Sequence, residues 1–140
     1  MSTDVSAAAL IYDDDNRLLL AQRSSNKTFA PNVWETIGGG IEFGESPEAC
    51  LRREIREELG DEVTIMSMQL FGVYNFVYDA IHLISIVYLV RIVGAIHSNF
   101  QEIQDVRWVT QQEAEELEFG FNCKERVIDF FNLHNTVTSL

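Results

Sequence analysis

Apolar and polar positions alternate along the chain in a pattern that predicts several strands. Residues 4–12 and 17–23 have the apolar character of strands, and the polar turn at 13–16 between them predicts a hairpin. Residues 63–78 and 81–93 are rich in β-branched and aromatic residues. With only two residues between them, they predict a long antiparallel pair.

Helical and extended segments follow one another, which predicts one mixed α/β unit. Shorter strands are expected at 33–37 and 104–109, where the first leads into a run of glycines. Helices are expected at 47–59, near 110–117 and at 122–134. We find no internal repeat or low-complexity segment in the sequence.

The helix at 47–59 has clear start and stop signals. Ser46 suits the N-cap, and Pro47 suits the first helical position, where its missing N–H does no harm. Gly60 can end the helix in the left-handed αL conformation. Apolar residues at i, i+4 and i+8 predict a buried stripe, formed by Leu51, Ile55 and Leu59.

Three carboxylates share one face of this helix. Glu54, Glu57 and Glu58 stand at i, i+3 and i+4, within an arc about 100° wide. Like charges at this spacing destabilise a helix and raise one another's pKa, so an ordinary surface helix gains nothing from them. Mg²⁺ or Mn²⁺ reverses this effect, because such cations take oxygen ligands and also bind substrate phosphates. The pattern therefore indicates a metal site suited to phosphate chemistry.

This helix belongs to a longer motif, GGIEFGESPEACLRREIREELGD at 39–61, which would occur by chance in about one such chain per million. The motif resembles the signature of the Nudix hydrolases, the MutT-like family: Gly, five residues, Glu, seven residues, Arg-Glu-apolar-x-Glu-Glu-x-Gly-apolar. Only Asp61 departs, since the family has an aliphatic residue there, and we expect Val63 to take over its packing role. The resemblance extends more loosely over residues 5–132.

The resemblance implies an α/β fold, a Nudix-type α/β/α sandwich with a mixed β-sheet between helices, in a single domain over residues 1–140. It implies bound Mg²⁺, with Mn²⁺ as a substitute. The implied ligands are the Gly39 carbonyl and the carboxylates of Glu54, Glu57 and Glu58. Arg53 and Glu45 would brace the glycine loop against the helix, and one of the glutamates would activate water.

Four residues outside the motif are further candidates. Arg23 resembles the family's substrate-facing arginine, with a surface role as the alternative. Glu102 stands where many relatives carry a loop glutamate that binds metal or acts as the base; a solvated charge is the alternative. Asn122 could read a base edge, although helix capping is favoured. Tyr78 stands roughly where dinucleoside polyphosphate hydrolases carry a tyrosine.

Aromatic residues and cysteines near the motif have simpler explanations. Trp34, Phe43 and Phe119 could stack on a base, but core packing is the favoured role for each. Cys50 and Cys123 are not spaced as a metal-binding pair, and we expect reduced thiols.

Charge and length restrict the partners. The chain has 140 residues, 46% of them hydrophobic, and a net charge of −12, which argues against a nucleic-acid polymer as ligand. No apolar run reaches the length of a membrane span and no basic leader begins the sequence, so we expect a cytoplasmic protein. A small phosphate-containing substrate remains compatible because a cation supplies positive charge. Small relatives often dimerise, which leaves a homodimer open.

We therefore expect a divalent-metal-dependent pyrophosphohydrolase that cleaves a nucleoside diphosphate linked to another group. The compact chain favours a nucleoside triphosphate, as in MutT-like enzymes. A dinucleoside polyphosphate or a nucleotide sugar is the alternative substrate. A non-catalytic Nudix ligand sensor is the alternative of another class, although such proteins commonly lose the glutamates that this motif keeps.

Overall fold

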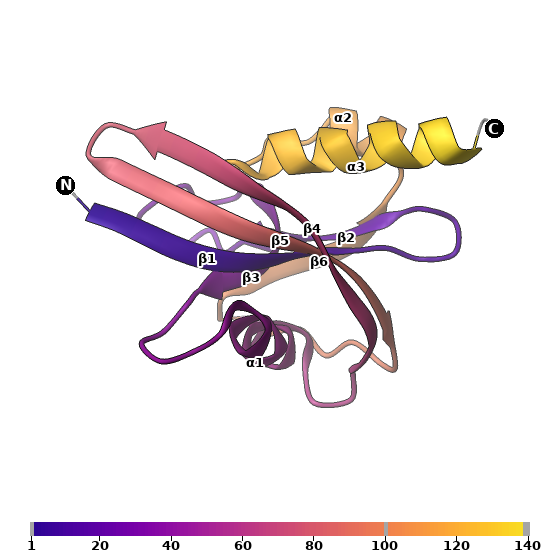
Figure 1. Cartoon of the computed structure of the whole chain (residues 1–140), viewed down its shortest axis with the longest axis horizontal. Helices are drawn as coiled ribbons and strands as arrows, with labels where there is room; N and C mark the ends of the chain where they lie inside the picture. Colours follow the sequence, from indigo (N-terminus) through magenta and orange to yellow (C-terminus); the bar gives the residue numbers. More distant parts are fainter. Residues whose placement is uncertain (1, 100, 139–140) are drawn as a thin grey trace.

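One mixed sheet forms the centre of the protein. The computed structural model describes residues 2–99 and 101–138, in which six strands lie in the order β4-β5-β1-β3-β2-β6. The strands are β1 (Ser2–Ile11), β2 (Leu18–Arg23), β3 (Trp34–Gly40), β4 (Thr64–Tyr78), β5 (Ile81–Val93) and β6 (Ile103–Val109). The helices are α1 (Pro47–Leu59), α2 (Gln111–Glu115) and α3 (Cys123–Thr138). Figure 1 shows α1 on one face of the sheet and α2 and α3 on the other, which confirms the α/β/α sandwich.

β1 runs through the middle of the sheet, and its second half, residues 7–11, is buried on both faces. Ala7, Ala9 and Ile11 belong to the core beneath α1, whereas Ala8 and Leu10 belong to the core beneath α3. This division follows from the two-residue period of a strand, which sends successive side chains to opposite faces. A strand with both faces covered needs a continuous apolar run, and this one has it.

The predicted hairpin of the first two strands is wrong. β3 lies between β1 and β2, and β1 pairs in parallel with β5 on its other side. The turn itself forms, with Asn16 at φ 57° and a single bridge between Tyr12 and Leu18. A polar turn reverses the chain, but it does not decide which strands become lateral neighbours.

The long antiparallel pair is confirmed, because β4 pairs with β5 along its length and Asp79, at φ 54°, helps to form the turn. β3 extends three residues further than the predicted 33–37. Gly38, Gly39 and Gly40 lie opposite Ala8, Ala7 and Ser6 of β1, so the glycine run belongs to the sheet. An alanine Cβ at Gly38 would collide with the β1 backbone, and glycine therefore permits this close pairing.

α1 begins and ends where the sequence predicts. The Ser46 side chain accepts a hydrogen bond from the Ala49 amide at 3.1 Å, and the predicted apolar stripe is buried. Gly60 has a positive φ of 97°, but its ψ of 171° differs from the expected αL conformation. The chain therefore leaves the helix in an extended direction, toward β4, and Gly60 passes close to the His97 backbone. No helix among the described residues is long and apolar enough to cross a membrane.

The aromatic residues near the motif differ in their surroundings. Trp34 is buried and Phe119 packs against the same core, as expected. The prediction for Phe43 is wrong, because its side chain is fully exposed. It lies in the loop before α1, next to Gly44, where no second element covers it. Cys50 and Cys123 are both buried free thiols.

Candidate functional site

The end of β3 packs directly against the acidic face of α1. The Gly38 amide donates a hydrogen bond of 3.1 Å to Oε2 of Glu58. A Cβ added at Gly39 would collide with the carboxylate of Glu54. Two of the three helix carboxylates therefore lie against the backbone of the glycine strand.

Arg53 joins the loop before α1 to the helix. Its Nε and Nη2 donate to the two oxygens of Glu45 at 2.7 and 2.9 Å, and Nη2 also donates to the Gly40 carbonyl at 3.1 Å. Nη1 donates to Oε1 of Glu54 at 2.9 Å and contacts Glu57 at 3.4 Å. The hydrogen bond from Arg53 lowers the pKa of Glu45 to about 2. This bidentate geometry fits the bracing role inferred from the resemblance.

The three helix carboxylates have unequal environments. Burial raises the pKa of Glu54, whose side chain is 15% exposed. Burial also raises the pKa of Glu58 well above its ordinary value, with smaller contributions from the charges of Glu54 and Glu35. Glu57 is 56% exposed at the edge of the cluster. The site therefore concentrates negative charge where solvent is partly excluded.

No group of three or more His, Cys, Asp or Glu side chains in the described part of the chain is arranged to hold a metal ion as it stands. Glu54 is directed to Arg53, Glu58 to the Gly38 amide, and the Gly39 carbonyl accepts a contact from the Cys50 thiol at 3.5 Å. The chemistry of the donors nevertheless fits a hard divalent cation, because they are carboxylate oxygens beside the backbone of Gly38 and Gly39.

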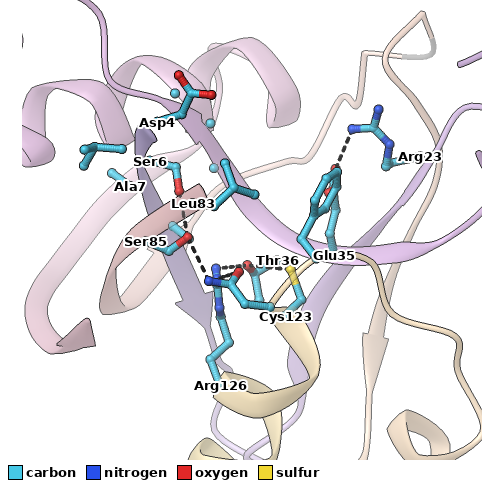
Figure 2. A pocket seen from close by; sticks show the side chains of 17 residues that line it. Asp4, Ser6, Ala7, Arg23, Glu35, Thr36, Leu83, Ser85, Cys123 and Arg126 are labelled. Atoms are coloured by element: carbon cyan, nitrogen blue, oxygen red, sulfur yellow. Dashed lines mark hydrogen bonds and ion pairs between the residues drawn. The ribbon is translucent and has the colours of Figure 1, made fainter. Parts of the chain in front are cut away.

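A pocket of about 250 Å³ adjoins this acidic cluster. Gly38, Gly39 and Gly40 form its border with α1. Strands β1 and β5, the end of β2 and the beginning of α3 form the other walls (Figure 2). The polar side chains that line it are those of Asp4, Ser6, Arg23, Glu35, Thr36, Ser85, Asn122 and Arg126.

Two of the candidates from outside the motif lie in this pocket. Arg23 contacts Glu35, with Nη1 3.7 Å from Oε1, and donates to the Phe29 carbonyl at 3.0 Å. Asn122 is 7% exposed and lies directly before α3. Its side chain contacts Ser85 at 3.4 Å and accepts a hydrogen bond from Arg126, so the amide faces the pocket wall.

The other two candidates lie elsewhere. Glu102 is in the turn before β6, 57% exposed, with its carboxylate 2.5 Å from Nζ of Lys27. Its charge contributes to the raised pKa of Glu58, so it is close to the acidic cluster without lining the pocket. Tyr78 is 63% exposed at the end of β4 and is not among the residues that line the pocket.

Sequence reasoning missed Glu35, Ser85 and Arg126. Burial raises the pKa of Glu35, which lies between the arginines of the pocket and the acidic cluster. A polar residue within an apolar strand was a usable signal for Ser85, which is 3% exposed and shares a 2.8 Å hydrogen bond with Ser6. No local pattern marks Arg126, because its place in the pocket depends on strands that are far away in the sequence.

Known proteins are similar to this chain in sequence and in fold. A family model described as NUDIX domain matches residues 2–130. The chain is 30% identical over 119 residues to a nucleoside triphosphatase NudI of Enterobacter sp. (strain 638), covering 79% of this chain and 84% of the relative. It is 33% identical to a MutT-like protein of Streptomyces ambofaciens, covering 80% of this chain and 67% of that protein.

Solved structures agree with the sequence comparisons. The MutT protein of Methanosarcina mazei Go1 superposes with a TM-score of 0.78 at 24% identity, covering 95% of each chain. This likeness concerns the fold, whereas the family match extends over the acidic helix, the glycine strand and most of the pocket. The chain therefore belongs to the NUDIX family of hydrolases, enzymes that act on pyrophosphate bonds.

Proposed function

We propose that the protein is a divalent-metal-dependent nucleoside triphosphate pyrophosphohydrolase. The observation that carries the proposal is the pocket bordered by Gly38, Gly39 and Gly40, with the carboxylates of Glu54 and Glu58 on the other side of the same backbone. A nucleoside in the pocket would extend its phosphates toward the acidic cluster. The names of the two relatives, a nucleoside triphosphatase and a MutT-like protein, support this substrate class.

The residues divide the chemistry between them. Glu54, Glu57 and Glu58 would hold Mg²⁺, or Mn²⁺ in its place, and Glu102, whose charge acts on Glu58, is the candidate for a further ligand. A bound cation would neutralise charge on the phosphoryl oxygens. A carboxylate of the cluster accepts a proton from water while the water oxygen forms a bond to phosphorus and the bridging P–O bond breaks. Arg53 keeps Glu45 and the Gly40 carbonyl in register during this step.

A hydrolysis screen tests the proposal, with the nucleotide products and any released pyrophosphate separated by chromatography. It compares nucleoside triphosphates with dinucleoside polyphosphates and nucleotide sugars, each with Mg²⁺, with Mn²⁺ and with EDTA. We expect nucleoside triphosphates to be cleaved fastest and EDTA to abolish cleavage. Full turnover after EDTA treatment would disprove the metal role, and faster cleavage of another class would reassign the substrate. Binding without turnover of any compound would indicate a sensor.

We also propose that two copies associate through β4. β4 is an edge strand of fifteen residues without a charged side chain, whereas the opposite edge, β6, has Asp105 and Arg107. Long, uncharged edges favour pairing with another strand, and a second −12 chain meets no charge repulsion along this strand. Its exposed apolar residues are Met66, Leu70, Val73, Val77 and Tyr78. Light scattering should report a dimer that Val73→Lys converts to monomer; a monomeric unsubstituted protein would disprove the proposal.

We place the protein in the cytoplasm. The two cysteines are buried free thiols on different elements, Cys50 on α1 and Cys123 on α3. Free thiols are typical of a reducing compartment. Fluorescence microscopy of the tagged protein tests the location, and an export product in the medium would contradict it.

A further inference from the structure

The floor of the pocket contains a buried arginine. Arg126 lies on α3, one turn after Asn122, and is 2% exposed. Its Nη1 donates to Oγ1 of Thr36 at 3.1 Å, and its Nη2 donates to Oδ1 of Asn122. Figure 2 shows the side chain of Arg126 extending toward Thr36, below Ser85. Its Nε has no hydrogen-bond partner among the described residues.

Arg126 has few partners for a buried charge. Its guanidinium has five N–H donors but makes two hydrogen bonds, both to neutral oxygens, and it lies over the Tyr74 ring, 5.6 Å from the ring centroid. No ion pair joins it to a carboxylate in the part of the chain that the structure describes, although it acts through space on Glu35. A buried charge with this few partners destabilises a protein, which suggests that the missing acceptors come from a ligand.

The neighbouring groups define the shape of that ligand. The hydrogen bond from Arg126 fixes Oδ1 of Asn122, so the amide nitrogen of Asn122 faces Ser85 as a second donor. Leu83 and the ring of Phe121 form apolar walls of the same pocket. Phe121 is held by the Phe29 ring at 5.5 Å. A flat ligand can pack its faces against these apolar walls, and hydrogen-bond acceptors on its edge can bind the donors of the floor.

We infer that Arg126 recognises the base of the nucleotide, donating N–H groups to the oxo group of a 6-oxopurine or a 4-oxopyrimidine. The inference rests on the proposed function, because it assigns the base end of the same substrate. A phosphate fits the floor less well, since the carboxylates of Glu35 and Asp4 line the same pocket. Arginine pairs with the oxo edge of guanine as its commonest base contact, whereas an amino group at that position offers no acceptor.

Matched nucleotide pairs test the inference by binding alone. Inosine and adenosine monophosphates differ at position 6 in oxo against amino, and uridine and cytidine monophosphates differ in the same way at position 4. Calorimetric titration without metal should show tighter binding of the oxo member, roughly 5- to 150-fold, as expected for one good arginine contact. Equal binding within both pairs, or tighter binding of the amino members, would overturn the inference.

Variants identify the residue responsible. Arg126→Gln should reduce the oxo preference to about twofold or less, and Arg126→Lys should restore it only in part because lysine lacks the forked donors. Arg17→Gln, which removes an exposed guanidinium at the β1–β2 turn, is the control and should keep the preference. A full preference in folded Arg126→Gln would overturn the assignment; if that variant does not fold, the preference in Arg126→Lys and in the unsubstituted protein decides.

The result of the binding experiment can be distinguished from the result of the hydrolysis screen that tests the proposed function. Equal binding of the oxo and amino members by the unsubstituted protein, with intact hydrolysis of triphosphates, would remove the role of Arg126 and keep the enzyme assignment. An oxo preference in monophosphate binding without hydrolysis of any triphosphate would keep Arg126 and remove the enzyme assignment.

Discussion

Three consecutive glycines at the centre of the site should respond differently to alanine. Gly38 has φ +153°, and a Cβ there would lie 2.7 Å from the Ala8 Cα, besides colliding with the Ala7 carbonyl oxygen. These atoms belong to the backbone of a paired strand, so they cannot rotate away. Overpacking of this kind lowers the free energy of unfolding by about 1–3 kcal/mol. The unfavourable φ adds about 1–2 kcal/mol.

The expected destabilisation of Gly38→Ala is therefore about 2–5 kcal/mol, a large part of the typical stability of a domain. For a chain of this size each kcal/mol lowers Tm by about 3–5 °C, so Tm should fall by about 6–25 °C. Gly39→Ala differs, because the three atoms nearest to the added Cβ all belong to the flexible carboxylate of Glu54. Rotation of that side chain relieves the collision, and Tm should fall by less than about 5 °C. The displaced carboxylate should instead weaken divalent-cation binding and turnover.

Thermal melts of the three variants in EDTA measure the stability effect, and Mg²⁺ titration with kcat measurement measures the effect on the site. Gly40→Ala is the stability control, since an added Cβ there meets no atom within 4 Å. A Gly38→Ala protein that melts within about 2 °C of the unsubstituted protein would refute the reasoning. An equal fall in Tm for Gly39→Ala would refute the distinction between backbone and side-chain collisions.

The remaining predictions concern the charged residues of the site. Glu57→Gln and Glu58→Gln keep volume and helix propensity, so each should lower kcat by orders of magnitude at nearly unchanged Tm; near-normal turnover in both would point to another site. If Glu102 is the base, Glu102→Gln should lower kcat about 10²–10⁴-fold with little change in KM, and a loss under about threefold would return that role to the helix. Glu45 has a folded pKa of about 2, below its ordinary value of 4.5, so its stabilising contribution is full above pH 4.5 and is lost as pH falls through about 2. The Tm advantage over Glu45→Gln should therefore be present at pH 6 and vanish near pH 2; an equal advantage at both pH values would contradict the assignment.

Local signals explain why α1 could be predicted to the residue. Its N-cap, first-turn proline and closing glycine act on neighbours within a few positions, and so does the i, i+4 spacing of its buried stripe. Strand existence was predictable for the same reason, since composition and alternation are local. The pairing of β4 with β5 was predictable because a two-residue turn joins them. The neighbours of β1 were not predictable, because the pairing of Ala8 with Gly38 and Val87 joins segments far apart in sequence.

The same distinction applies to the site. The three carboxylates of α1 share a face because of helix geometry, so spacing alone could group them. Glu35 and Arg126 line the same pocket only because the fold brings β3 and α3 together there. No spacing rule relates residues that are more than eighty positions apart. Recognising Glu35 and Arg126 as site residues therefore required the structure, whereas the metal-binding candidates could be recognised from the sequence.

The glycine segment of β3 lies between the two parts of the candidate site, the acidic cluster and the pocket. In β3, the backbone of Gly38 and Gly39 contacts Glu58 and Glu54 on α1 and also borders the pocket that Arg126 lines. A Cβ at Gly38 would collide with the β1 backbone and one at Gly39 with the Glu54 carboxylate, so glycine permits the close contacts of β3 with β1 and α1. In the proposed function, the sheet thus sets the distance between base recognition and bond cleavage, which accurate positioning of a phosphate requires.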